Sequence, residues 1–108
     1  MSIKRPHIIC HMASSIDGKI DGDALRSIMR SGEYETLHSK LGGNDWICGR
    51  TTMQQHFAED EPFVSKTNTP AGTEGVHIAR RADSYAISVD TVGKLRWSSE
   101  EIDGDHLI

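Results

Sequence analysis

A short segment near the middle of the sequence combines an apolar run, a glycine and three polar side chains that could bind an anion. Residues 46–48, Trp-Ile-Cys, are typical of a buried strand, and Gly49 follows them with no Cβ to obstruct a ligand. Arg50 then offers a guanidinium, and Thr51 and Thr52 offer hydroxyls, where a helix is expected to begin. Because the amide groups of a first helical turn and a guanidinium both suit phosphate, the segment predicts binding of a nucleotide cofactor.

The same segment can also be interpreted as an ordinary strand-to-helix turn with a solvated arginine. Thr51 and Gln54 have the spacing of a capping box, in which the hydroxyl accepts an amide proton of the first turn and the Gln side chain reaches back to the cap. The segment has neither the glycine and lysine spacing of a P-loop nor the three-glycine dinucleotide fingerprint. The cofactor hypothesis therefore depends on other parts of the chain.

A second candidate is the polar stretch at residues 14–23. It follows residues 7–13, whose β-branched and apolar content predicts a buried, central strand. A loop at the end of a central strand is a common position for a binding site. Its Asp17-Gly18 pair, taken alone, is interpreted as a turn former.

The spacing of apolar residues predicts two helices after this loop. The first covers residues 31–40, with Ser31 as its cap and Gly42-Gly43 as its stop. The second begins at Thr51 and is short. Residues 63–83 are polar and show no sustained period, which is typical of a functional loop or a partly disordered segment.

Further strands are predicted at residues 45–49 and 85–89, and another is expected to begin near residue 103. The resulting order of strand, loop, helix, strand and helix predicts an α/β fold with a mostly parallel sheet flanked by helices. A length of 108 residues fits one domain, residues 1–108. The apolar run at the end of the sequence predicts that this domain is the N-terminal portion of a longer one.

Composition excludes several classes of function. The formal net charge is −4 and the 12 Lys and Arg residues are spread along the chain, so generic nucleic-acid binding is not expected. No apolar run approaches the length of about 20 residues that a membrane helix needs, and the N-terminus lacks the pattern of a signal peptide. A cytoplasmic protein without a membrane partner is predicted. The hydrophobic share of 36% predicts a thin core.

The histidines and cysteines do not predict a metal site. On the strand expected at residues 7–13, His7 and His11 share one face while Cys10 points to the other, so the three cannot converge on one ion. Cys10 and Cys48 are both expected inside buried strands, where a thiol without a cationic neighbour stays protonated. We therefore interpret both as core residues rather than nucleophiles.

Four short motifs in the order seen here resemble the N-terminal half of the reductase domain of riboflavin biosynthesis. This domain is the C-terminal part of the bacterial bifunctional deaminase-reductase family and is similar in fold to dihydrofolate reductase. The resemblance covers most of the chain and is carried by Ser15-Ile16-Asp17-Gly18-Lys19, Gly49-Arg50-Thr51-Thr52, Asp60-Glu61-Pro62, and Val89-Asp90-Thr91 with Gly93-Lys94-Leu95.

This resemblance implies an NADPH-dependent oxidoreductase that reduces a ribosylaminopyrimidine phosphate to its ribitylamino form. A hydride transfer needs mainly the positioning of two bound molecules, so no catalytic triad is implied. The residues that the resemblance places at the cofactor are Ser14, Asp17, Gly18, Gly49, Arg50, Thr51, Thr52 and Thr91. Ser15 and Asp60 are implied to lie near the substrate, although an acidic residue such as Asp60 at a helix end is more often only solvated.

Alternatives to this enzyme remain open at the level of the sequence. The family places substrate-phosphate contacts on the helix before the second strand, where Leu41 and its neighbours offer little. A related reductase of a pterin or of another small molecule therefore fits almost as well. A non-catalytic α/β domain used for binding or dimerisation is a further alternative, and a homodimer is expected.

Overall fold

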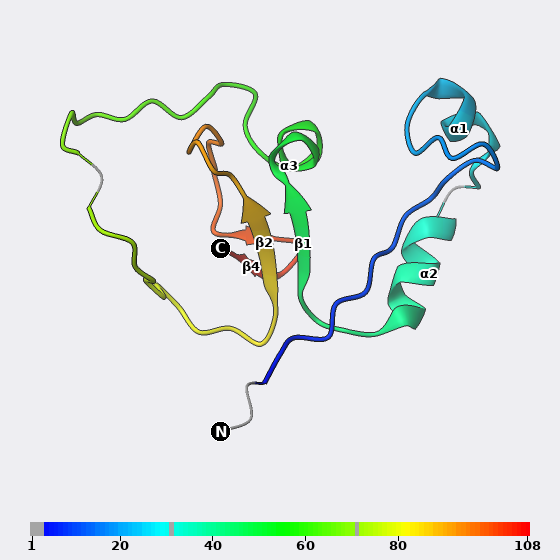
Figure 1. The fold of residues 1–108 in the computed structure, drawn as a ribbon, viewed down its shortest axis with the longest axis horizontal. Coiled ribbons are helices and arrows are strands. Elements are labelled where there is room, and N and C mark those ends of the chain that lie inside the picture. The colour runs from blue at the N-terminus through cyan, green and yellow to red at the C-terminus, as the bar shows by residue number, and fades with distance from the viewer. Residues whose placement is uncertain (1–3, 31, 71) are drawn as a thin grey trace. The chain divides into compact units, whose positions relative to one another are not determined.

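The computed structural model describes residues 4–30, 32–70 and 72–108 and divides the chain into two compact units, Met1–Gly42 and Gly43–Ile108 (Figure 1). Each unit is described by itself. The first contains helices α1, Asp23–Ile28, and α2, Glu33–Leu41. The second contains a sheet and helix α3, Arg50–His56.

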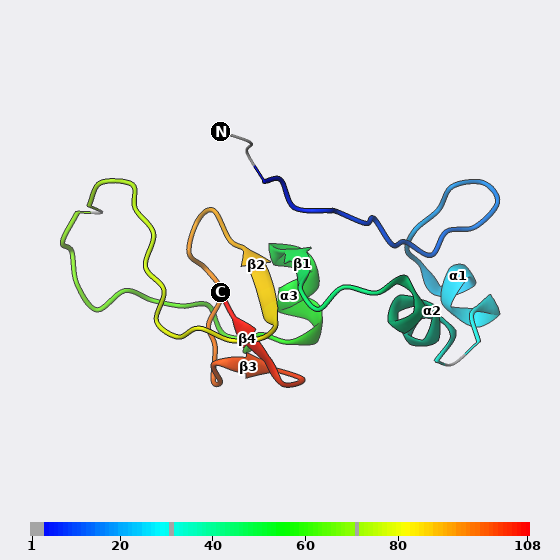
Figure 2. The ribbon, with the colours of Figure 1, turned by 90° about the horizontal axis from the view of Figure 1, so that it is seen from below.

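The sheet of the second unit has four strands in the order β1-β2-β4-β3 (Figure 2). Their bounds are Trp46–Gly49 for β1, Tyr85–Val89 for β2, Glu101–Ile102 for β3 and Asp105–Leu107 for β4. β1 pairs parallel with β2, β2 pairs parallel with β4, and only the pairing of β3 with β4 is antiparallel. The expected mixed α/β fold with a mostly parallel sheet is thereby confirmed, as are the strands predicted at residues 45–49 and 85–89.

Polar contacts at the start of the parallel strands fix their register. Asp105 on β4 accepts hydrogen bonds from Trp46 Nε1 at 2.7 Å and from Ser84 Oγ at 2.5 Å. The Tyr85 amide donates to Asp45 Oδ1 at 2.9 Å. These bonds hold the amino ends of β1, β2 and β4 level, so that their carboxyl ends share one edge of the sheet.

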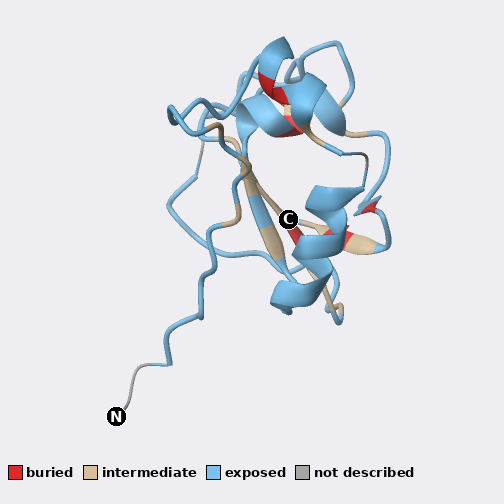
Figure 3. Ribbon diagram, turned by 90° about the vertical axis from the view of Figure 1, so that its right-hand side faces the viewer, coloured by how far each residue is buried: buried red, intermediate tan, exposed pale blue. Residues whose placement is uncertain are grey.

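The core of the second unit lies between α3 and one face of the sheet. Its centre is Met53 of α3, which is 0% exposed and packs with Ala86, Leu95 and Ile102. Half-buried residues surround this group, among them Trp46, Cys48 and Trp97. Buried residues are few among those described, as Figure 3 shows, so the thin core expected from composition is confirmed.

A tight hairpin joins β3 to β4. Its turn contains Asp103 at φ 51° and Gly104 at φ 89°, and left-handed backbone of this kind favours Gly and tolerates Asp. The fourth strand expected near residue 103 is thus confirmed, whereas the short β3 beside it was not anticipated. Two residues carry too little pattern to mark a strand, and β3 exists because β4 pairs with it.

Helix α2 confirms the helix expected at residues 31–40. The predicted cap, Ser31, lies outside the described residues, and the helix has Gly32 as its N-terminal flanking residue. The predicted stop is confirmed, because Gly42 and Gly43 have φ values of 74° and 90°, which β-carbon-bearing residues adopt only with strain. Helix α1 was not predicted, since its six residues are too few for a clear period.

The strand predicted at residues 7–13 is wrong. Residues 4–13 have no regular secondary structure, and Ile8 and Met12 are 71% and 65% exposed. Cys10 is likewise exposed rather than buried in a strand. The β-branched composition favours a pleated surface only where another strand supplies hydrogen bonds, and none of the described strands pairs with this segment.

Candidate functional site

Two of the predicted cofactor-binding segments meet at the carboxyl edge of the sheet. β1 and β2 are parallel neighbours, and their last residues, Gly49 and Val89, are in register. Arg50–Thr52 follows directly after β1, and Thr91 lies two residues after β2. The parallel pairing therefore brings both segments to the edge of the sheet at which α/β proteins commonly bind ligands.

The junction between β1 and α3 differs from the prediction in its capping. The helix begins at Arg50, its N-cap is Gly49, and no side chain caps it. The predicted capping box of Thr51 and Gln54 is therefore wrong: Gln54 Nε2 donates instead to the Glu59 carbonyl at 2.6 Å. Gly49 remains extended and the chain enters the helix at once, which places Thr51 inside the first turn, where its hydroxyl cannot act as the cap.

Because no side chain caps α3, the polar groups at the junction between β1 and α3 are accessible. Arg50, Thr51 and Thr52 are all exposed. A Cβ placed on Gly49 would have no neighbouring atom within 4 Å, so the space over this glycine is open. The amide groups of the first turn of α3 have no side-chain acceptor, and in the described chain no ion pair of Arg50 is observed.

Asp90 organises the turn that carries Thr91. Its Oδ2 accepts the Leu95 amide proton at 2.8 Å, and its carbonyl accepts that of Gly93 at 3.3 Å. The Leu95 hydrogen bond is the main reason that the pKa of Asp90 is lowered, and the positive charge of Arg50 contributes to a smaller extent. Arg50 is therefore close enough to influence the turn after β2. In the sequence, Asp90 was noted only as part of a motif, and its role in holding the turn after β2 was missed. The Asp-x-x-Gly pattern of residues 90–93 could have indicated this role.

Cys48 lies on β1 in register with Ser88 on β2, on the face that packs against α3. It is half-buried, and burial raises the pKa of its thiol. A raised thiol pKa means that the reactive thiolate is scarce near neutral pH. The interpretation of Cys48 as a core thiol is thus supported, while that of Cys10 is not.

The predicted loop residues of the first unit form a compact turn. Ser15 Oγ donates to the Asp17 carboxylate and accepts the Lys19 amide proton at 3.0 Å. The Gly18 amide donates to the Ser15 carbonyl at 2.9 Å, and Gly18 has a φ of 85°. The hydrogen bond from Ser15 is the main cause that lowers the pKa of Asp17, so this carboxylate is negatively charged at neutral pH. Ser14 is exposed beside this turn.

A cavity of about 270 Å³ opens next to this turn. Ser15 and Asp17, one predicted at the substrate and one at the cofactor, line it together with Lys19 and Asp21. Its remaining wall is apolar and consists of Ala24, Leu25 and Ile28 of α1. Polar groups that face an apolar wall can orient a small flat molecule.

A second cavity of the first unit, of about 440 Å³, runs along α2. Arg30 and Lys40 bring positive charge to it, next to Glu33, Thr36 and Leu37. Sequence reasoning expected little from the helix before β1 and missed this pair of basic side chains. Their spacing of ten residues is not a helical repeat, so no local pattern indicates that both side chains line one cavity.

Asp60 lies exposed in the loop that follows α3. Its neighbours attach this part of the loop to the segment after β2: the Glu59 amide donates to the Arg96 carbonyl, and the Phe63 amide donates to the Lys94 carbonyl, both at 2.9 Å. Among the described residues no hydrogen bond of the Asp60 carboxylate is observed, and neither cavity includes it. The structure therefore gathers the predicted residues into one group in each unit, and Asp60 belongs to neither group.

No protein-family model, no curated protein and no solved structure matches this chain. Within the described residues, no three side chains of His, Cys, Asp or Glu are grouped as a metal ion would require. The helices that the structure describes are all too short or too polar to cross a lipid bilayer.

Proposed function

We propose that this chain is an NADPH-binding reductase domain with a dihydrofolate reductase-like fold. Its carboxyl sheet edge, with Gly49, Arg50, Thr51, Thr52 and Thr91, binds the phosphates and the adenosine end of the cofactor. The observation that carries the proposal is the parallel pairing of β1 with β2, which brings two segments 40 residues apart to one edge. Ligands bind at this edge in open α/β sheets.

The residues at this edge fit an anionic cofactor chemically. The Arg50 guanidinium, the two threonine hydroxyls and the uncapped amides of α3 are all donors, and phosphate oxygens are acceptors. Asp90 is the neighbouring carboxylate, and its Oδ2 is already occupied by the Leu95 amide. NADPH, when bound, supplies the hydride, and the role of these side chains is to bind and orient it.

The resemblance assigns roles to residues of both units, and each unit is considered by itself. In this proposal, Ser14, Asp17 and Gly18 contact the nicotinamide, and Ser15 and Asp60 are the candidates for contacts with the substrate. The cavity beside Ser15 and Asp17 supports this role, since an apolar wall opposite polar groups suits a flat heterocycle.

The proposed substrate is a ribosylaminopyrimidine phosphate, reduced at its opened ribose to the ribitylamino form, as in riboflavin biosynthesis. The basic side chains of Arg30 and Lys40, which line one cavity along α2, support a phosphorylated substrate. Reduction of a pterin is the alternative within the same class. A pterin without phosphate would gain nothing from these two cations, so neutralising them separates the two substrates.

The test of the cofactor is Arg50→Ala. Loss of a charge-assisted contact should weaken NADPH binding by about 1.5 to 3 kcal/mol, or roughly tenfold to 150-fold in Kd. NADH affinity should fall less if Arg50 contacts the 2′-phosphate, and by the same factor if it contacts the pyrophosphate. Calorimetric titration of both nucleotides at one fixed salt concentration measures the two affinities.

The matched control is Arg81→Ala, which removes an exposed arginine from the long loop before β2. It should leave both affinities unchanged, and neither variant should alter the unfolding transition. If the Arg50→Ala protein bound NADPH as tightly as the wild type, the edge would be only a strand-to-helix turn, and the assignment of residues 49–52 would be withdrawn.

A non-catalytic domain that forms a homodimer is the second candidate, and three exposed apolar side chains on the face of the sheet opposite α3 favour it. Side chains alternate along a strand, so Ile47, Val89 and Ile108 point away from α3. They are 58%, 45% and 56% exposed. Light scattering that found a dimer broken by Ile47→Asp, together with calorimetry that found no nucleotide binding, would favour this candidate over the reductase.

A further inference from the structure

The parallel register of β1 and β2 brings two opposite charges together at the carboxyl edge of the sheet. Gly49 and Val89 are register partners, and Arg50 and Asp90 follow these partners directly. Because paired strands lie about 5 Å apart, the backbones of Arg50 and Asp90 begin side by side. The pKa of Asp90 agrees with this proximity, since it is lowered mainly by the Leu95 hydrogen bond and to a smaller extent by the charge of Arg50.

The two oxygens of the Asp90 carboxylate are both engaged within the protein. Oδ2 accepts the Leu95 amide proton at 2.8 Å. Oδ1 is buried, and in the part of the chain that the structure describes no hydrogen bond to it is observed. With one oxygen bonded and the other buried, Asp90 influences a bound nucleotide through its charge and through the turn that it holds, rather than as a direct ligand of a ribose hydroxyl.

The turn that Asp90 holds is attached to the core. Leu95, whose amide Asp90 accepts, is 6% exposed and packs with Met53 of α3. The exposed Thr91 lies between Asp90 and Leu95 in the chain. Asp90 therefore fixes the position of Thr91 relative to α3, the helix that begins with Arg50.

We propose that Asp90 is a positioning residue that sets the cofactor preference of the carboxyl edge. Its carboxylate holds Thr91 in place and partly balances the charge of Arg50, which weakens the preference for the 2′-phosphate of NADPH over the 2′-hydroxyl of NADH. This inference rests on the proposed function, in which Arg50 and Thr91 contact the cofactor. A phosphate monoester carries up to about two negative charges at neutral pH, and the Asp90 carboxylate repels them, whereas the hydroxyl of NADH is uncharged.

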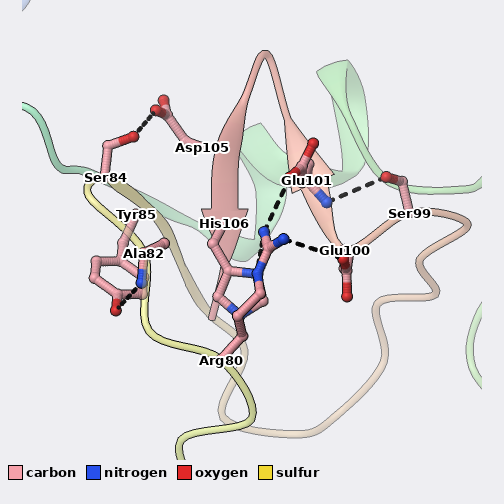
Figure 4. A network of polar contacts seen from close by, with 9 residues as sticks. All are labelled: Arg80, Ala82, Ser84, Tyr85, Ser99, Glu100, Glu101, Asp105 and His106. Carbon is pink, nitrogen blue, oxygen red and sulfur yellow. Dashed lines mark hydrogen bonds and ion pairs between the residues drawn. The ribbon is translucent and has the colours of Figure 1, made fainter.

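The opposite end of β2 is fixed by contacts that do not involve Asp90 (Figure 4). Ser84 Oγ donates to Asp105 on β4 at 2.5 Å, and Arg80 Nη2 lies 3.2 Å from Nδ1 of the buried His106. These contacts at the amino end hold β2 in its register. A change of charge at residue 90 should therefore alter the edge without shifting the strand.

The test is Asp90→Asn, which removes the charge but keeps an oxygen that can accept the Leu95 amide proton. At low ionic strength this variant should bind NADPH roughly threefold to tenfold more tightly than the wild type, because a negative charge near the phosphate is lost. NADH affinity should change by less than about twofold, since NADH lacks the 2′-phosphate. The gain for NADPH should shrink to about twofold or less at about 0.5 M salt, because salt screens exposed charges, whereas a purely structural effect would persist. Calorimetric titration of both nucleotides with the full chain measures these affinities.

Two further variants separate the charge of Asp90 from its hydrogen bond. Asp83→Asn is the matched control, because it makes the same change at an exposed residue two positions before β2, and it should leave both affinities unchanged. Asp90→Ala also lacks the acceptor for Leu95, so it should bind NADPH more weakly than Asp90→Asn. Unchanged NADPH affinity in Asp90→Asn, or an equal gain in Asp83→Asn, would overturn the role of the charge. Equal affinities of Asp90→Asn and Asp90→Ala would overturn the positioning of Thr91.

If Asp90→Asn fails to fold, the wild type still decides the question with two fragments of the cofactors, 2′,5′-ADP and 5′-AMP. An unopposed contact between a guanidinium and a phosphate is worth about tenfold or more in affinity, so a wild-type preference for 2′,5′-ADP above about tenfold would contradict a balancing carboxylate. A wild type that binds no nucleotide would remove the proposed function and this inference with it. Nucleotide binding without the differences expected for Asp90 would overturn this inference alone.

Discussion

Replacing Met53 with alanine should remove a large part of the stability of the unit formed by residues 43–108. Met53 is fully buried and joins α3 to Ala86, Leu95 and Ile102. The change deletes three heavy atoms, each comparable to a methylene worth about 0.8 kcal/mol, and leaves a cavity that adds to the loss. A loss of about 3 kcal/mol is expected, a large share of the marginal stability of a small domain.

Urea unfolding followed by tryptophan fluorescence measures this loss, because Trp46 and Trp97 both pack against the same core. Met53→Leu nearly conserves the volume and should cost less than about 1.5 kcal/mol. Gln55→Ala, at an exposed position of the same helix, should be close to neutral. A loss below about 1 kcal/mol for Met53→Ala would refute the view that α3 is held on the sheet mainly by this side chain.

Further predictions concern the polar contacts and one glycine. The pKa of Asp105 is lowered, chiefly by the Ser84 hydrogen bond and then by that of Trp46. The charged carboxylate of Asp105 therefore stabilises the folded unit at pH values above the ordinary carboxyl pKa, and this stabilisation is lost as the pH falls and the carboxylate is protonated. Asp105→Asn should therefore reduce the loss of stability below about pH 4, measured by urea unfolding across a pH series. Trp46→Phe should lower the free energy of unfolding by about 1 to 2 kcal/mol, because the indole donor to Asp105 is lost. Trp97→Phe is the control, since no hydrogen bond of the Trp97 indole is observed in the described chain, and an equal loss for both variants would contradict this reason. Gly42→Ala should lower the free energy of unfolding by about 1 to 3 kcal/mol, because the backbone angles at this position, φ 74° and ψ −178°, suit only glycine. Thermal melting of α2 followed by circular dichroism measures the effect, and an unchanged melting curve would refute the prediction.

Much of the secondary structure could be predicted because its signals are local. The apolar run of β1, the alternation of β2 and the helical spacing of α2 are contained within each segment. The glycine stop after α2 is likewise written into two adjacent residues. The order of these elements was enough to indicate a mixed α/β fold with a mostly parallel sheet.

The candidate site could be predicted only in part. The types and spacing of Arg50, Thr51 and Thr52 indicated a possible anion site. The predicted capping of α3 was wrong, because the extended backbone of a single residue, Gly49, decides where the helix begins and therefore which residue is its cap. The basic pair Arg30 and Lys40 was missed because ten residues separate the two and no local pattern links them to one cavity.

The sequence by itself determined which segments of this protein can be helices and strands and which carry donors for an anion. Only the tertiary structure decided which strands pair: residues 7–13 have strand composition yet no partner, while the two residues of β3 are a strand because β4 lies beside them. It also decided that Thr91 shares an edge with Arg50 and that His106 is buried against Arg80. The physical reason is that strand pairing and side-chain burial depend on contacts between distant residues, whose free energy no local pattern contains.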